Sequence, residues 1–120
     1  MPPARENRAA ELIRRYLGER APSWSASTLQ HERKSLEDLL SFLDGRDLAR
    51  EPVLAFAADV RERVTVRKGT PWAAASIAGV LGAVRRFLRW CFARGHLLQD
   101  TGALIVPPRV ERLPRALSEA

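Results

Sequence analysis

The sequence predicts an all-α protein, a single four-helix domain followed by an extended linker. Apolar residues recur at spacings of three and four in four segments, as they do on the buried side of amphipathic helices. The chain has 120 residues, of which 46% are hydrophobic, and this suffices for one core. Glycine and proline stand between the periodic segments, where they favour turns. The expected helices are residues 8–20, 25–44, 51–65 and 71–94.

The first segment, residues 8–20, is a short amphipathic helix that ends before the breaker Ala21-Pro22-Ser23. Its apolar side carries Tyr16, the only tyrosine of the chain. A tyrosine acts as a nucleophile only when a neighbouring group activates it, and no such base lies near Tyr16 in sequence. We therefore assign Tyr16 to the core.

Two start signals compete at the beginning of the second helix. Ser25 can cap the backbone amide of Thr28, and Ser27 with Gln30 can form a capping box. The sequence leaves both open. The apolar stripe of this helix comprises Leu29, Leu36, Leu39, Leu40, Phe42 and Leu43.

The fourth segment, residues 71–94, carries the longest apolar stripe. Thr70 is expected to cap it, Pro71 suits its first turn, and Gly95 suits a left-handed C-terminal cap. The third segment is less well bounded, because its end at residues 64–66 is β-branched. The centre of the core is expected to consist of Leu36, Leu40, Leu81, Val84 and Leu88.

The outer side of the fourth segment is basic and has little bulk. No acidic residue occurs in residues 69–99, so its four arginines have no carboxylate nearby in sequence. Gly79 and Gly82 leave room for close approach by a duplex or by another helix. Lysine and arginine outnumber aspartate and glutamate by 20 to 14 over the whole chain, for a net charge of +6, which favours an anionic partner such as nucleic acid.

The sequence contains no catalytic motif and no spacing typical of metal ligands, so neither a cofactor nor a metal is expected. The single cysteine, Cys91, excludes an internal disulfide and is expected to be buried. Trp72 and Trp90 are expected to lie together on the outer side of the fourth helix and to pack at a helix interface. No long apolar or signal-like segment occurs, which favours a cytoplasmic protein without a membrane partner.

These residues carry a resemblance to the N-terminal core-binding domain of tyrosine recombinases of the Xer and phage-integrase type. The resemblance spans nearly the whole chain. Its most specific residues are Ser76, Ile77, Leu81, Ala83, Val84, Arg85 and Phe87, then Arg94-Gly95, and the tail Leu113–Glu119, LPRALSE. The chain departs from the family pattern at Glu32, where an aromatic residue is common, at Gly79, where a basic residue is common, at Gly82, where serine is common, and at Gly102, where proline is usual.

The resemblance implies a SAM-like orthogonal bundle whose second and fourth helices face the major groove of duplex DNA. Residues 1–107 would then be the core-binding domain, and residues 108–120 the linker toward a catalytic domain that this chain does not include. It also implies that this chain does not itself cleave DNA. Other protomers would join it in the complete synaptic complex, while the isolated fragment is expected to be a monomer.

The expected DNA-binding surface combines the outer start of the second helix, the outer side of the fourth and the loop before it. Its residues are Ser25, Ser27, Thr28, Gln30, His31, Arg33, Lys34, Lys68, Ser76, Gly79, Arg85, Arg86 and Arg89. Two alternatives remain open from the sequence. One is a SAM-like protein-interaction module whose positive charge is incidental, and the other is a helix-turn-helix regulator.

Overall fold

The computed structural model describes residues 4–108, with side chains from residue 8 onward. This part of the chain folds into four α-helices and two 3-10 helices, without a strand beyond one isolated bridge. The elements are α1 (Ala4–Arg20), η1 (Ala21–Ser23), α2 (Ala26–Leu43), α3 (Arg50–Arg61), α4 (Ala74–Ala93) and η2 (Thr101–Leu104). The predicted all-α, four-helix fold is confirmed, whereas the predicted linker lies, apart from Pro108, outside the described residues.

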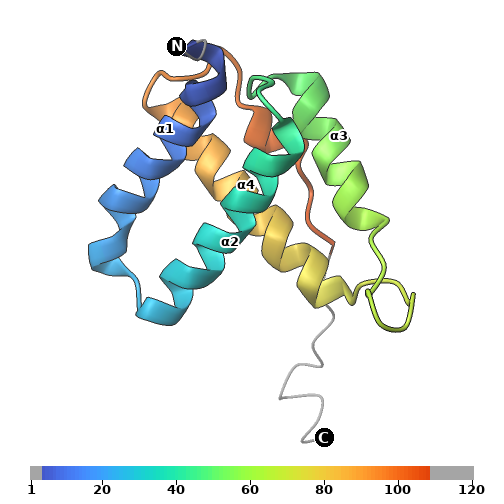
Figure 1. The fold of residues 1–120 in the computed structure, drawn as a ribbon. Coiled ribbons are helices and arrows are strands. Elements are labelled where there is room, and N and C mark those ends of the chain that lie inside the picture. Colours follow the sequence, from blue (N-terminus) through green and yellow to red (C-terminus); the bar gives the residue numbers. More distant parts are fainter. Residues whose placement is uncertain (1–3, 109–120) are drawn as a thin grey trace, which may run out of the picture.

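Figure 1 shows how the helices are arranged: α2 and α4 cross near the centre, and α1 and α3 flank the crossing. The fourth helix is the centre of the packing, because it contacts α1, α2, α3 and η2. None of the described helices is both long and apolar enough to cross a membrane.

The start of α2 follows the first of the two capping signals. Ser25 is extended, and its hydroxyl accepts a hydrogen bond of 3.1 Å from the backbone amide of Thr28. The hydroxyls of the two residues also lie 3.0 Å apart. Because this cap satisfies one of the free amides of the first turn, it fixes where α2 begins.

The predicted boundary between the third and fourth helices is wrong. α3 ends at Arg61, and α4 begins only at Ala74, so Thr70 and Pro71 do not start a helix. Instead Pro71 forms a bridge with Val64, and the Thr70 hydroxyl lies 2.9 Å from that of Thr65. The β-branched run that was expected to end α3 therefore forms one arm of a hairpin, in agreement with its strand propensity.

The end of α4 is a Schellman motif, as the predicted glycine cap requires. Gly95 has a φ of +80°, its amide donates to the Phe92 carbonyl at 3.0 Å, and the His96 amide donates to the Cys91 carbonyl at 2.8 Å. The chain then returns along α4 through η2. A Cβ at Gly102 would lie 2.8 Å from the Arg85 carbonyl oxygen, so only glycine fits this close approach.

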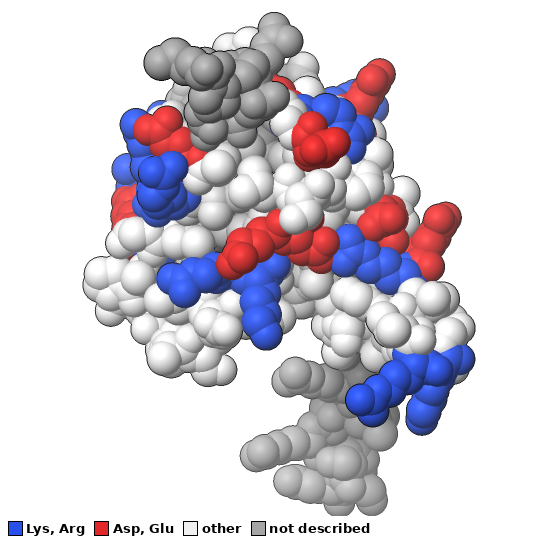
Figure 2. Space-filling model, in the orientation of Figure 1, with Lys and Arg blue, Asp and Glu red and all other residues white. Residues whose placement is uncertain are grey.

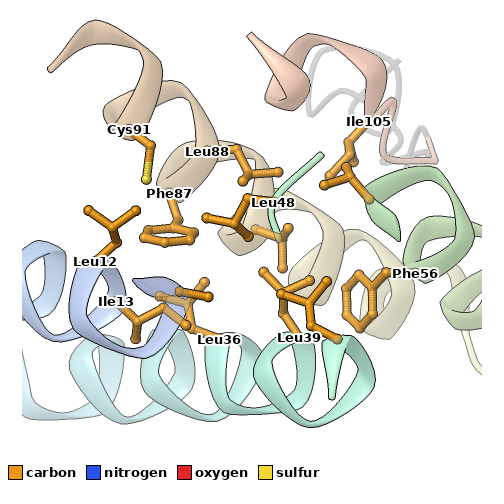
Figure 3. Packing of buried hydrophobic residues seen from close by; sticks show 14 of the residues in the cluster. Leu12, Ile13, Leu36, Leu39, Leu48, Phe56, Phe87, Leu88, Cys91 and Ile105 are labelled. Carbon is orange, nitrogen blue, oxygen red and sulfur yellow. The ribbon is translucent and has the colours of Figure 1, made fainter. Parts of the chain in front are cut away.

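All four helices contribute to one hydrophobic core, to which Leu48 and Ile105 are added from the connections (Figure 3). Of the residues expected at its centre, four are fully buried and Leu40 is only partly buried. Leu40 lies at the edge of the buried stripe of α2, and Leu39 takes the central position. The four fully buried residues are Leu36, Leu81, Val84 and Leu88.

The aromatic residues divide between core and surface. Tyr16 is buried, as predicted, and its ring packs edge-on against Trp24 and Phe87. Trp90 is also buried beside Tyr16, and its indole N–H donates to Glu19 at 2.6 Å. The expectation that Trp72 lies beside Trp90 is wrong, because Trp72 precedes α4 and stacks under the guanidinium of Arg63, 5.3 Å from its ring centroid.

Candidate nucleic-acid interface

The crossing of α2 and α4 brings the first halves of these two helices onto one surface. The contact between them is close at Gly79, where an added Cβ would lie 3.2 Å from Nε2 of His31. The glycine therefore serves helix packing, and the imidazole of His31 covers it. The exposed polar residues of the two helix starts are Ser25, Ser27, Thr28, Gln30, His31 and Ser76.

Gly82 likewise makes room for a side chain of this protein. An added Cβ at Gly82 would lie 3.3 Å from a terminal nitrogen of Arg86, so the guanidinium lies over the glycine. Gly79 and Gly82 therefore do not leave open space through which a duplex could reach the backbone of α4, because side chains of this protein already fill that space. The departures of Gly79 and Gly82 from the family pattern have a structural reason, namely the side chains of His31 and Arg86 that lie over them.

Arg86 is paired with an acid that is distant in sequence. The carboxylate of Glu32 on α2 accepts hydrogen bonds at 3.1 Å from Nε and at 2.6 Å from a terminal nitrogen of Arg86. Glu32 is only 3% exposed, and its second oxygen, Oε2, is buried without a described hydrogen-bond partner. The expectation that the arginines of α4 are unpaired is therefore wrong for Arg86, because helix crossing supplies the acid that α4 lacks.

Two further arginines, Arg89 of α4 and Arg94 directly after this helix, also have carboxylate partners. Arg94 is ion-paired with Glu19, and Arg89 lies 3.8 Å from a carboxylate oxygen of Asp100. Arg85 differs from them, since no ion pair is described for it and its Nε is buried without a hydrogen-bond partner. Together with Gly82 and Pro107, the residues Arg85, Arg86 and Arg89 line a groove of about 300 Å³.

The basic residues of α2 divide between two sides of the helix. Arg33 lines a groove with Arg14 and Leu17 of α1, whereas His31 lies against α4. At 100° per residue, positions 31 and 33 are about 200° apart around the helix, so they cannot share a face. The structure therefore does not bring Arg33 together with His31. Lys34 is exposed, and no ion pair is described for it.

Figure 2 shows how charge changes along α2. Lysine and arginine side chains lie over the lower half of this helix, and acidic side chains form a band across its middle. A second basic group lies over the loop between α3 and α4, which contains the predicted site residue Lys68. Phosphates are attracted by the first group and repelled by the acidic band, so the basic half of α2 is the part suited to DNA.

The buried titratable groups offer no reactive side chain. Burial, with a smaller contribution from the nearby Glu32 carboxylate, raises the pKa of Tyr16 to about 12. Burial also raises the pKa of the Cys91 thiol to about 12. Both groups stay protonated at neutral pH, in agreement with their assignment to the core. Among the described side chains, no group of three histidine, cysteine or carboxylate residues is placed to hold a metal ion.

Glu32 lies buried beneath this surface, and no role was expected for it from the sequence. A signal for it existed, because Glu32 stands four residues before Leu36 and seven before Leu39, on the apolar stripe of α2. A carboxylate on such a stripe is buried, and a buried carboxylate needs a cationic partner. The family pattern, in which an aromatic residue is common here, indicates the same buried position.

Comparison with known proteins gave two curated relatives. The chain is 34% identical over 119 residues to the tyrosine recombinase XerC of Roseiflexus castenholzii, a match that covers 93% of this chain and 35% of the relative. It is 36% identical over 95 residues to the tyrosine recombinase XerD of Rhizobium meliloti, covering 78% of this chain and 30% of the relative. No protein-family model matched, and the comparison with solved structures gave no significant match.

The chain thus spans about a third of the length of the curated relatives that it matches. Both relatives are tyrosine recombinases, and both matches extend over most of this chain. The resemblance to tyrosine recombinases inferred from the sequence is therefore confirmed, and the chain matches a fragment of a Xer-like tyrosine recombinase.

Proposed function

We propose that this chain binds duplex DNA as the N-terminal clamp arm of a site-specific tyrosine recombinase. Residues 1–107 form the core-binding domain, and residues 108–120 lead to a catalytic domain. The arm itself is not catalytic, and it holds a protomer in register on a recombination site while other protomers complete the synaptic complex in the cytoplasm. The observation that carries this proposal is the crossing of α2 and α4, which exposes the polar starts of both helices on one surface.

The chemistry of this surface suits duplex DNA. Lys34 and Arg85 have no described carboxylate partner, so their charges are available to phosphates. Hydroxyl, amide and imidazole groups of the helix starts can hydrogen-bond to base edges, which is how sequence is read in the major groove. The proposed contacts are thus of two kinds, phosphate contacts that set affinity and polar contacts that set register.

Removal of either free cation is expected to weaken binding to any duplex. Lys34→Ala and Arg85→Ala should each reduce the slope of log affinity against log salt by about one unit, because each removes one phosphate contact. Ser76→Ala should have a smaller effect on affinity. Fluorescence-anisotropy titrations of a random duplex across a salt series, after circular dichroism has verified folding, give these slopes.

Arg14→Ala is the matched control for this experiment. Arg14 is an exposed arginine of α1 for which no ion pair is described. It lines a groove with Arg33, on the other side of α2 from His31, so its removal changes net charge but not the side of α2 that carries His31 and Lys34. Arg63 is unsuitable as a control, because it is paired with Asp38 and Asp59. Equal losses in all three charge variants would indicate general electrostatic attraction, and the assignment of DNA to α2 and α4 would then be wrong.

The purified chain is expected to bind duplex DNA weakly and to leave supercoiled plasmid unrelaxed. One half of a clamp retains affinity near the nonspecific range, about 10⁻⁴ to 10⁻⁶ M at physiological salt. Strand cleavage requires an activated nucleophile, and the only tyrosine, Tyr16, is buried and protonated. Agarose-gel analysis of plasmid topology tests this expectation. Relaxation of the plasmid by the pure chain would contradict the proposal that this chain binds DNA without cleaving it.

A further inference from the structure

The segment between α3 and α4 is a well-defined hairpin with a basic tip. Its arms are joined by backbone hydrogen bonds from Trp72 to Arg63 at 3.0 Å and from Thr65 to Thr70 at 2.7 Å. The turn is closed by a bond of 2.9 Å from the Gly69 amide to the Thr65 carbonyl, and Gly69 takes a φ of +63°. The tip between the two threonines is Val66-Arg67-Lys68-Gly69.

The base of the hairpin is fastened to two helices through Arg63. Its guanidinium donates to Asp38 of α2 at 2.9 Å and to Asp59 of α3 at 3.0 and 2.9 Å. The hydrogen bond to Asp38 makes the largest contribution to raising the pKa of Arg63. The same guanidinium also lies over the rings of Trp72 and Phe56, at 5.3 and 5.7 Å from their centroids. The hairpin is therefore held in one position before any partner arrives.

The tip itself touches almost nothing in this protein. Val66 is 101% exposed, and Arg67 and Lys68 are exposed with no described ion pair. Between Glu62 and Asp100 the chain contains no acidic residue. Figure 2 shows the resulting basic group at the edge of the molecule, over this loop. Two free cations beside a small apolar side chain fit a surface of phosphates and deoxyribose rings.

We propose that the whole hairpin tip, and not Lys68 alone, is a preformed DNA contact, in which Arg67 and Lys68 together bind backbone phosphates beside those reached from α2 and α4. This inference rests on the proposed function. Only three residues separate Thr70 from the start of α4 at Ala74, so a duplex that lies over the exposed first turn of α4 passes close to the hairpin. Because the base is already fixed by Arg63, binding costs little loop-ordering entropy.

The test is a salt series with the double variant Arg67→Ala/Lys68→Ala on a random duplex, measured by fluorescence anisotropy. Loss of two phosphate contacts is expected to reduce the salt slope by about two units. The control is Arg14→Ala/Arg50→Ala, which removes the same charge at exposed positions. Arg50 begins α3 and so lies at the other end of that helix from the hairpin. The control should change the slope by much less than the hairpin variant.

The outcomes separate this inference from the proposed function. If the wild-type chain does not bind duplex DNA, the proposed function fails. If the wild type binds and Lys34→Ala lowers the slope, while the hairpin variant matches the wild type or the control, only the hairpin contact is refuted. Circular dichroism melts of all variants should coincide, because the side chains that are removed make no described contact with the core.

Discussion

Replacement of Leu81 by alanine is expected to lower the free energy of unfolding by about 2 to 5 kcal/mol, the cost of truncating a buried leucine. Leu81 is fully buried and belongs to the core cluster. It lies on α4, which contacts α1, α2 and α3, so the cavity it leaves cannot be filled by moving one neighbour. Urea denaturation followed by circular dichroism measures the loss.

Leu98→Ala is the matched control, because it makes the same chemical change at a side chain that is 101% exposed. Its effect should stay within about 0.5 kcal/mol, as for most surface substitutions. Similar midpoints for the two variants would mean that α4 is not the centre of the core, and the assignment of its apolar stripe would have to be revised.

Most of the fold could be predicted because its signals are local. The apolar stripes of α2 and α4 follow from spacing alone, and they correctly gave Leu36, Val84 and Leu88 as core. The left-handed Gly95 depends on residues within one helical turn, so the sequence shows it directly. The cap at Ser25 is equally local, but it was one of two alternatives that the sequence left open.

The boundary between α3 and α4 could not be predicted for the opposite reason. A threonine followed by proline is typical of a helix start, but Thr70 and Pro71 also suit a hairpin arm. In the folded protein the base of the hairpin is held by contacts of Arg63 with Asp38 and Asp59. Asp38 lies 25 residues away from Arg63, outside any local window.

The charge of the candidate site was misjudged for the same reason. Glu32 is 54 residues from Arg86, and Glu19 is 75 residues from Arg94, so neither pair is visible in the composition of α4. The absence of acidic residues from residues 69–99 predicted free positive charge. The fold supplies carboxylate partners from Glu19 of α1, Glu32 of α2 and Asp100 before η2, which leaves Arg85 as the arginine of α4 without a described partner.

The ion pair between Glu32 and Arg86 predicts an unequal response to mutation. The Glu32 side chain is 4% exposed, whereas that of Arg86 is 56% exposed. Arg86→Ala leaves a buried carboxylate without a cation and should cost about 3 kcal/mol, the lower end for a broken buried pair, since some water then reaches the carboxylate. Glu32→Gln returns Arg86 to water and keeps an acceptor oxygen, so it should cost only about 1 kcal/mol.

A double-mutant cycle tests the physical cause of this difference. If the penalty of Arg86→Ala arises from the unpaired carboxylate, Glu32→Leu in the Arg86→Ala background should recover most of the lost stability, because leucine suits the apolar stripe of α2. Urea denaturation of wild type, Arg86→Ala, Glu32→Leu and the double variant supplies the coupling energy. Equal costs for Arg86→Ala and Glu32→Gln, or no recovery in the double variant, would show that Arg86 stabilises the bundle by packing over Gly82 rather than by neutralising Glu32.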